Sequence, residues 1–324
     1  MTSAIILGSH GGPELLQLEQ AELPDPGPGE LRVRHVAIGV NFHDIYVRSG
    51  LYRTLALPGI PGIEASGVVE EVGPEVSDFV PGDRICYVTG SYGAYAAQRN
   101  LPQELALKLP NDVDHETAAA TILKGLTACM LLCREYPVKA GDHILVHAAA
   151  GGVGQLLCRW ADHLGAVVIG TVGDLRKEAV ARAAGAAHVF SSSDQDLVAK
   201  VMEITKGQGV AVAYDSVGRD SFQTSLSSLS YFGKLVNFGQ SSGPVPSFEV
   251  SQLATRSNSL SRPIVFHYLR DPRVLREMAA EVFALIGGGI LKADIGLRLP
   301  LAQAAEAHAM LESRRTIGST ILLP

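Results

Sequence analysis

Cysteine is scarce in this chain of 324 residues, which contains only Cys86, Cys129, Cys133 and Cys158. Cys129 and Cys133 have the i, i+4 spacing of a helix face, but no C-x-x-C motif or paired histidine accompanies them. This pattern supports neither a disulfide framework nor a cysteine-based metal site. We therefore expect four buried, reduced thiols.

Long runs of charge and of apolar residues are missing too. The net charge is −6 and lysine and arginine do not cluster, so we expect no nucleic-acid partner and no membrane partner. The first residues, Met-Thr-Ser-Ala-Ile-Ile-Leu, lack the basic and long apolar regions of a signal peptide. No apolar stretch reaches bilayer-spanning length without interruption. A cytoplasmic protein is the expectation.

The composition, 47% hydrophobic and 19% charged, is that of a well-packed enzyme, and the length favours two domains. Residues 1–124 contain short β-like runs separated by turns such as Pro24-Asp-Pro-Gly-Pro-Gly29. Glycines in such runs let strands bend or approach other backbone closely, which predicts a small, strongly curved β-barrel. Its clearest strands are expected at Ala4–Leu7, Leu15–Glu19 and Leu31–Val40.

Beyond residue 142, β-like and helical segments alternate. Expected strands lie near 143–148, 166–172, 187–190, 210–214 and 233–238, with helices at 152–164, 175–184, 194–206 and 219–230. This alternation predicts an α/β fold with a doubly wound parallel sheet and right-handed crossovers. An apolar helical stretch precedes it, at 118–133, with an interruption at Lys124-Gly125.

The last 60 residues are too few for a comfortable third core. After a last strand at Ser261–Phe266 we expect helices at Asp271–Ile286 and Ala302–Leu311 and a strand at Gly318–Leu323. This segment is expected to return to the first domain. The predicted domains are therefore 1–124 with 264–324, and 125–263.

The strongest functional signal lies at residues 143–165. An apolar run meets the turn Ala149-Ala-Gly151-Gly152-Val-Gly154, which opens an amphipathic helix. Glycines let a ligand approach the backbone, and a helix N-terminus offers unpaired N–H groups and a positive dipole end. The G-x-G-x-x-G fingerprint is imperfect, because Ala149 takes the first glycine position. With a second β-like run at the right distance, the segment predicts a dinucleotide-binding βαβ unit.

Longer motifs resemble the medium-chain dehydrogenase/reductase superfamily. They are Gly39-Val-Asn-Phe-His-Asp-Ile-Tyr46, Gly62-Ile-Glu-Ala-Ser-Gly67, Pro81-Gly-Asp-Arg84 and Lys124-Gly-Leu-Thr-Ala128. Together with His147–Gly154, Tyr214–Gly218 and Phe238–Gly243, they resemble its zinc-free quinone oxidoreductase branch, the ζ-crystallin-like enzymes. The resemblance implies a GroES-like catalytic domain, a Rossmann domain, a homodimer, and NADPH-dependent reduction of quinones.

The chain departs from the zinc-containing relatives of that superfamily at their ligand positions. Asn41 and Ile63 stand where those enzymes have Cys and His, and Lys124 stands near a further Cys. None of the three supplies a ligand suited to Zn²⁺. His43 and Glu64 remain as two isolated donors, so no metal site is expected.

The resemblance assigns Lys177 to the 2′-phosphate of NADPH. Asp174 lies at about the distance expected for a ribose-binding acid, but that acid normally ends the strand, where Val172 stands. Ser192 replaces an aromatic residue common in the family, which weakens adenine-ribose packing. The turns 215–218 and 238–243 end two strands and should face the cofactor. The candidate cofactor-binding residues are Asn41, Thr127, Ala150, Gly151, Gly152, Val153, Gly173, Lys177, Ser192, Ser216, Phe238, Gly239, Ser241 and Arg314.

The candidate catalytic residues are Asn41, Tyr46, Tyr52, Thr127 and Arg262. By resemblance, Asn41 and Thr127 line the nicotinamide, and the other three line the substrate side. A phenol or a guanidinium there donates a hydrogen bond to a quinone oxygen as charge develops; packing in the core is the alternative role for each tyrosine. Two other functions stay open, namely reduction of α,β-unsaturated carbonyls by NADPH, and NADPH binding without catalysis.

Overall fold

The structure, a computed structural model, describes residues 1–324 as two units. The first unit contains residues 1–123, 270–287 and 292–324, and the second contains 124–269 and 288–291. The chain thus leaves the second unit after Leu269, a few residues later than the predicted boundary at 263. The segment before that exit forms α7 (Val265–Tyr268), and the Tyr268 hydroxyl donates a hydrogen bond to Glu135 of the same unit.

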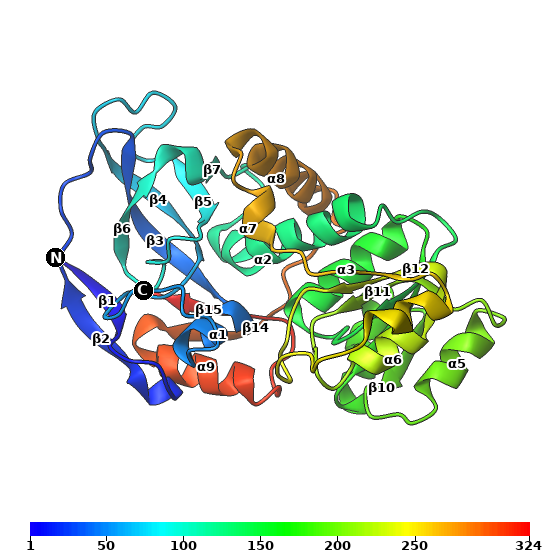
Figure 1. Cartoon of the computed structure of the whole chain (residues 1–324). Coiled ribbons are helices and arrows are strands. Elements are labelled where there is room, and N and C mark those ends of the chain that lie inside the picture. Colours follow the sequence, from blue (N-terminus) through cyan, green and yellow to red (C-terminus); the bar gives the residue numbers. More distant parts are fainter. The chain divides into compact units, whose positions relative to one another are not determined.

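A bent, mostly antiparallel sheet organises the first unit (Figure 1). Its longest strand, β3 (Glu30–Val40), pairs with β4 (Glu64–Val72), β6 (Gln98–Pro102) and β15 (Ser319–Leu323). The register of β3 on β4 shifts twice, and a Cβ at Gly67 would lie 2.1 Å from the Arg34 carbonyl oxygen. Bulges bend the strand and this glycine lets two backbones close up, which accounts for the predicted curvature.

The other elements complete this unit around the same sheet. The strands are β1 (Thr2–Leu7), β2 (Leu16–Ala21), β5 (Arg84–Val88), β7 (Ala106–Lys108) and β14 (Ile295–Pro300). The helices are α1 (Phe42–Arg48), α8 (Pro272–Gly287) and α9 (Ala304–Glu312), with short 3-10 turns at Pro13–Leu15, Gln103–Leu105 and Leu301–Gln303. Because β15 pairs with β3 and β14 with β15, the C-terminal segment is part of this sheet.

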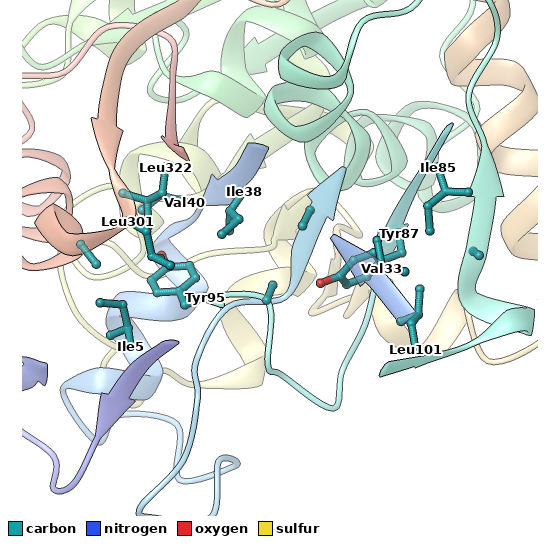
Figure 2. Packing of buried hydrophobic residues seen from close by; sticks show 14 of the residues in the cluster. Ile5, Val33, Ile38, Val40, Ile85, Tyr87, Tyr95, Leu101, Leu301 and Leu322 are labelled. Carbon is teal, nitrogen blue, oxygen red and sulfur yellow. The ribbon is translucent and has the colours of Figure 1, made fainter. Parts of the chain in front are cut away.

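Both ends of the chain contribute to the core of the first unit. Ile5 of β1, Val33 and Ile38 of β3, Leu101 of β6 and Leu322 of β15 are fully buried in one cluster (Figure 2). Burying an aliphatic side chain contributes roughly 1.5–3 kcal/mol. The C-terminal strand is therefore a structural member of the unit and not an appendage.

A parallel sheet in the order β10-β9-β8-β11-β12-β13 organises the second unit (Figure 1). Its strands are β8 (His143–Val146), β9 (Val167–Val172), β10 (His188–Ser191), β11 (Val210–Asp215), β12 (Leu229–Asn237) and β13 (Ser259–Ser261). Its helices are α3 (Gly152–His163), α4 (Glu178–Ala183), α5 (Leu197–Ile204) and α6 (Phe222–Ser227), with 3-10 turns at Leu175–Lys177 and Val250–Thr255. The predicted doubly wound sheet is confirmed.

The strand order locates the place where this sheet binds ligands. From β8 the chain moves outward through β9 to β10, then restarts at β11 on the other side of β8. Right-handed crossovers therefore put α3 and α4 on one face and α5 and α6 on the other. The reversal lies between β8 and β11, and such sheets bind ligands beyond the carboxyl ends of the strands at that point.

Two local predictions were wrong. Lys124-Gly125 does not interrupt its helix, because α2 (His115–Cys129) runs through it and continues as a π-helix at Met130–Glu135. A helical glycine costs only about 1 kcal/mol, and the buried apolar neighbours outweigh that. The strand expected at Ser261–Phe266 is β13 at 259–261, since Pro263 lacks an N–H for the ladder and α7 follows.

Two further expectations need correction. Residues His115–Glu135 form one helix of 21 residues with a mean hydropathy of 1.3, so one segment does have the length and composition of a membrane span. Its most apolar window is 83% buried inside the protein, as in a core helix. All four cysteines are free thiols, but Cys133 is only half-buried, unlike the other three.

Two histidines, His35 and His308, are buried inside the first unit. The ring of His35 is 2.7 Å from the Ala96 carbonyl oxygen through Nδ1 and 2.9 Å from the Tyr87 hydroxyl through Nε2. His308 lies 2.9 Å from the Tyr95 hydroxyl through Nε2. Burial lowers the pKa of each imidazole to about 3, so both rings stay neutral in the folded protein.

We predict that the first unit loses stability as the pH falls below about 6.5. The unfolded histidines titrate near that value, so between it and pH 3 the unfolded chain binds more protons and acid favours unfolding. At pH 5, His35 and His308 should each lower the free energy of unfolding by about 2 kcal/mol. Denaturant titrations at pH 7 and pH 5 measure this difference. His308→Gln should shrink it, and a pH difference unchanged in this variant would contradict the assignment.

Candidate active site

The turn after β8 brings the N-terminus of α3 to the carboxyl edge of the parallel sheet. Ala148 adopts a left-handed φ of 53°, and the Gly151 N–H donates to its carbonyl oxygen over 2.9 Å. A Cβ at Gly154 would lie 2.2 Å from that oxygen, so only glycine lets α3 pack this closely. The N–H groups of Gly152 and Val153 lie in the first turn of α3, where helix N–H groups have no intrahelical acceptor.

A buried polar network lies beneath this turn, and the sequence did not reveal it. His147 contacts the Thr171 hydroxyl through Nδ1 and the Ser225 hydroxyl through Nε2, both at 2.9 Å. Ser225 in turn donates to Asp215 over 3.1 Å. Burial lowers the pKa of His147, and the nearby Asp215 carboxylate opposes that shift. The network ties β8, β9, β11 and α6 together at the edge where the turn sits.

The end of β9 carries an ion pair and one further cation. The Asp174 carboxylate accepts hydrogen bonds from Arg176 Nε at 2.8 Å and from Arg176 N at 2.9 Å, which lowers its pKa to about 2. Asp174 is therefore paired with Arg176 and is poorly suited to bind a ribose. Lys177 is partly buried, and burial lowers its pKa while Asp174 raises it. Asp174, Arg176 and Lys177 together therefore carry a net charge of +1 next to the end of β9.

Ser192 lies beside the same strand end. Its N–H donates to the carbonyl oxygen of Val172 over 2.8 Å, and its side chain is exposed. Gly173 follows Val172, and a Cβ there would meet nothing within 4 Å. Ser192 and Gly173 therefore lie at the same end of β9, and Lys177 follows four residues after Gly173.

The turns after β11 and β12 pack on each other. The Ser241 N–H donates to the Ser216 carbonyl oxygen over 3.2 Å, and the Phe238 N–H donates to the Asp215 carbonyl oxygen over 2.8 Å. A Cβ at Gly239 would lie 2.6 Å from the Ser216 oxygen, so the two turns fit only with glycine at this position. Both turns lie at the carboxyl edge, beside the turn after β8.

Arg262 follows the edge strand β13 in the second unit. Its Nη1 donates to the Asn237 carbonyl oxygen over 2.9 Å, at the end of β12. The preceding Ser261 hydroxyl donates to Glu135 over 2.8 Å, and Lys234 pairs with that carboxylate at 2.8 Å. These hydrogen bonds lower the pKa of Glu135. Glu135, at the end of the π-helix, thus fixes the strand that carries Arg262. Thr127, the remaining candidate in this unit, is half-buried on α2.

In the first unit, Asn41 is held by two carboxylates. It precedes α1, and its N–H donates to Asp44 over 2.9 Å. Its side-chain Nδ2 donates over 2.7 Å to Glu64, which is fully buried and also accepts the Leu123 N–H at 2.9 Å. The carboxamide oxygen of Asn41 only accepts hydrogen bonds, so its NH₂ must face the Glu64 carboxylate, and this contact fixes which way the carboxamide points.

Tyr46 and Tyr52 lie together, as their shared predicted role requires. Their ring centroids are 5.1 Å apart in an edge-to-face contact. His43 lies edge-to-face on Tyr52 with centroids 5.6 Å apart, and it stacks on Tyr92 at 6.0 Å. The motifs indicated a substrate role for the two tyrosines, whereas His43 stood out only as an isolated metal donor. Tyr92, 49 residues from His43, lies in none of these motifs.

Arg314 is the candidate for which the structure gives the least support. It follows α9 with a left-handed φ of 57°, and its side chain is exposed. Two residues earlier, Glu312 pairs with the buried Arg48 of α1 at 2.8 Å. The end of α9 therefore lies beside α1 within the first unit.

Comparisons with known proteins agree with this fold. The chain matches the alcohol dehydrogenase GroES-like domain family over residues 27–111 and the zinc-binding dehydrogenase family over residues 152–283. It is 44% identical to a quinone oxidoreductase of Pseudomonas aeruginosa, with 100% of both chains covered. It is 41% identical to a 2-haloacrylate reductase of Burkholderia sp., with 100% of this chain and 99% of the relative covered.

A solved structure of Escherichia coli quinone oxidoreductase complexed with NADPH superposes with a TM-score of 0.97 at 43% identity, covering 99% of this chain and 100% of the other. The chain belongs to the quinone oxidoreductase branch of the medium-chain dehydrogenase/reductase superfamily. The resemblance seen in the motifs is thereby confirmed, as is a GroES-like domain joined to a Rossmann-type sheet.

The glycine turn of this quinone oxidoreductase-type chain gives a sharp test. A Cβ at Gly151 would lie 3.2 Å from the Ala148 oxygen, which a small shift relieves, and the backbone φ of −79° accepts any residue. Gly151→Val should therefore fold, with an unchanged circular dichroism spectrum, but should lose dinucleotide binding because its side chain blocks close approach. Gly154→Ala is the contrasting variant, which should lower the melting temperature. Micromolar binding retained by folded Gly151→Val would place the pyrophosphate elsewhere.

Proposed function

We propose that this protein is an NADPH-dependent quinone reductase that works without a metal ion. The observation that supports it most is the full-length similarity to quinone oxidoreductases, one of them solved with NADPH. The cofactor fits the residues present, since the turn after β8 needs glycine for its close packing and the end of β9 carries Lys177. Both features belong to the second unit.

Each candidate cofactor residue takes a role that its position allows. The N–H groups of Gly152 and Val153 hold the pyrophosphate at the N-terminus of α3, and Ala150 and Gly151 form the turn that lets it approach. Lys177 pairs with the 2′-phosphate, while Gly173 and Ser192 border the adenosine. The turns that contain Ser216, Phe238, Gly239 and Ser241 border the nicotinamide half. We assign Asn41, Thr127 and Arg314 to the cofactor from the family resemblance.

The bound cofactor supplies a hydride to the quinone, and the protein supplies orientation and hydrogen bonds. Tyr46 and Tyr52 of the first unit, and Arg262 of the second, are assigned to the quinone. Each donates a hydrogen bond to an oxygen on which negative charge develops. Quinones accept hydride readily, so positioning of the reacting atoms is most of the task.

Reduction of an α,β-unsaturated carbonyl is the second candidate function. It has the support of 41% identity to a 2-haloacrylate reductase over the whole chain. Steady-state oxidation of NADPH with a panel of quinones, enals and 2-chloroacrylate decides between the two. A protein that binds NADPH but oxidises it with none of these acceptors would be the non-catalytic alternative.

We also propose that the protein is a cytoplasmic homodimer without nucleic-acid or membrane partners. β13 ends the parallel sheet, and the nearby Tyr231 and Phe232 are 67% and 79% exposed. An exposed sheet edge beside apolar side chains is suited to pairing with a second copy. A molar mass in solution of twice 34.3 kDa would support this assembly.

Cofactor choice is predicted to depend on Lys177. Because Val172 replaces the ribose-binding acid and Asp174 is paired with Arg176, NADPH should bind more tightly than NADH. Lys177→Ala should lose roughly 1–3 kcal/mol of binding free energy for NADPH, the range for hydrogen bonds to charged groups, and almost none for NADH. Calorimetry with both cofactors measures this. Equal losses for the two would remove the assignment.

Independence from metal is predicted from the first unit. Asn41 Nδ2 already donates to Glu64, and Ile63 is fully buried and apolar, so hydrogen-bond donors must replace the Lewis acid of the zinc enzymes. We expect reduction of 1,4-benzoquinone, no oxidation of ethanol, and the same rate after dialysis against EDTA. Stoichiometric zinc by elemental analysis, with activity lost to the chelator and restored by metal, would overturn this prediction.

A further inference from the structure

Three side chains of the first unit form a hydrogen-bonded chain that has no part in the proposed function so far. The Thr54 hydroxyl hydrogen-bonds the Tyr92 hydroxyl, and that hydroxyl lies 3.2 Å from His43 Nε2. Thr54 is exposed, Tyr92 is 5% exposed, and His43 is partly buried. The chain therefore leads from solvent through a buried phenol to an imidazole.

The inner end of this hydrogen-bonded chain, His43, contacts Tyr52, one of the two tyrosines assigned to the quinone. His43 and Tyr46 are both on α1, whose N-terminus is fixed by the contact between Asn41 and Asp44. The His43 ring lies edge-to-face on Tyr52, and Tyr52 lies edge-to-face on Tyr46. His43, Tyr52 and Tyr46 therefore form a row of contacting rings, and His43 is its one imidazole.

The backbone at Tyr92 is held in a conformation that a bulky residue rarely adopts. Its φ is 61°, in the left-handed region, which is unfavourable for a residue with a Cβ. Arg99 Nη1 donates to the Tyr92 carbonyl oxygen over 2.5 Å, and the next N–H, of Gly93, donates to Ile60 over 2.9 Å. These contacts maintain the strain, and the result is a phenol aimed at both Thr54 and His43.

Reduction of a quinone by hydride transfer requires a proton that the hydride donor does not supply. The quinone and a hydride from NADPH give a hydroquinone monoanion, and one proton completes the hydroquinone. We propose that Thr54, Tyr92 and His43 deliver this proton from solvent to the reduced oxygen. The inference rests on the proposed quinone reductase activity.

The proton moves along the chain in balanced steps. His43 gives the Nδ1 proton to the hydroquinone oxygen and receives the Tyr92 hydroxyl proton at Nε2. The Tyr92 oxygen takes the hydroxyl proton of Thr54, and Thr54 takes one from water. No electron moves along the chain, and the net reaction consumes one solvent proton. Return of His43 to its first tautomer, by a second proton exchange with solvent, resets the chain.

The charge state of the ring agrees with this role. Burial lowers the pKa of His43 to about 4, so the imidazole is neutral near pH 7 and has one donor and one acceptor nitrogen. Burial also raises the pKa of Tyr92, which keeps its hydroxyl protonated. A neutral imidazole beside a neutral phenol is suited to relay a proton without storing a charge.

The first test compares acceptors whose reduced oxygens differ in basicity. Tyr92→Phe should reduce kcat with 1,4-benzoquinone by roughly 100-fold, the lower end of the range contributed by a positioned proton donor. The loss should shrink with tetrachloro-1,4-benzoquinone, whose reduced oxygen is less basic and needs little help. The solvent deuterium isotope effect on kcat should change in the variant. Equal losses for both acceptors, with an unchanged isotope effect, would show a structural role and overturn the proposal.

The second test uses a matched pair at the solvent end. Thr54→Val removes the hydroxyl and keeps the shape, so it should reproduce part of the loss, whereas Thr54→Ser should restore the wild-type rate. Ser77→Ala, which removes an exposed hydroxyl bonded to Asp78 in the first unit, is the control and should behave as wild type. A Thr54→Val variant that matches wild type in rate and isotope effect would exclude Thr54 from the chain.

The tautomer and hydrogen bond of His43 can also be measured in the protein without cofactor or substrate. Nitrogen NMR of ¹⁵N-histidine-labelled protein, with His43 assigned from the His43→Gln spectrum, should show a neutral ring at pH 6 that is protonated on Nδ1. Tyr92→Phe should shift the Nε2 resonance, and an Nε2 that does not respond would contradict the hydrogen bond. If wild type turns over none of the quinones, the proposed function fails. If wild type reduces quinones and these variants match it in rate, isotope effect and Nε2 resonance, only the proposed proton transfer through Thr54, Tyr92 and His43 is excluded.

Discussion

The first unit depends on one buried carboxylate. Glu64 is fully buried, and it fits because Gly39 of β3 has no side chain; a Cβ there would lie 2.2 Å from its Oε1. Its oxygens accept the Asn41 amide and the Leu123 N–H, so one residue of β4 connects the end of β3, the start of α1 and the middle of α2. A carboxylate removed from water is costly unless such donors surround it. The position of α1, and of the aromatic side chains on it, follows from this arrangement.

Most of the fold could be predicted from the sequence, because its signals are local and consistent. The alternation of strand and helix beyond residue 142 specifies the parallel sheet, and the small-residue turn specifies the start of α3. The two failures had opposite causes: burial overrode a local signal in one, and a local signal overrode the apolar pattern in the other. Gly125 does not break α2, since packing of the surrounding apolar residues outweighs the propensity of one glycine. Pro263, by contrast, ended β13 earlier than the apolar pattern suggested.

The candidate site was predictable to the extent that its residues stand in recognisable motifs. Gly151, Lys177 and Tyr46 were predicted in this way and stay predictions. The residues that hold them in place were not, because they come from distant parts of the chain and are ordinary polar side chains in sequence. Asp215 and His147 are 68 residues apart, yet both bond Ser225 beneath the glycine turn. A polar residue at the end of an otherwise apolar strand, such as His147, was the one available signal for that network.

At the positions where the resemblance places the zinc ligands of other members of the superfamily, a hydrogen bond fixes the first unit of this chain locally. In the zinc-containing relatives a metal would tie the residues at positions 41 and 63 together, by the resemblance that the motifs carry. Here Asn41 is instead bonded to Glu64, one residue beyond Ile63, so an amide–carboxylate hydrogen bond links the same two segments. Such a bond holds geometry but polarises an oxygen far less than Zn²⁺ does. The proposed metal-free reaction would therefore need an acceptor that takes hydride easily and a separate source of protons. The His43 imidazole on α1, in contact with Tyr52 and Tyr92, is the group that we propose for the second need.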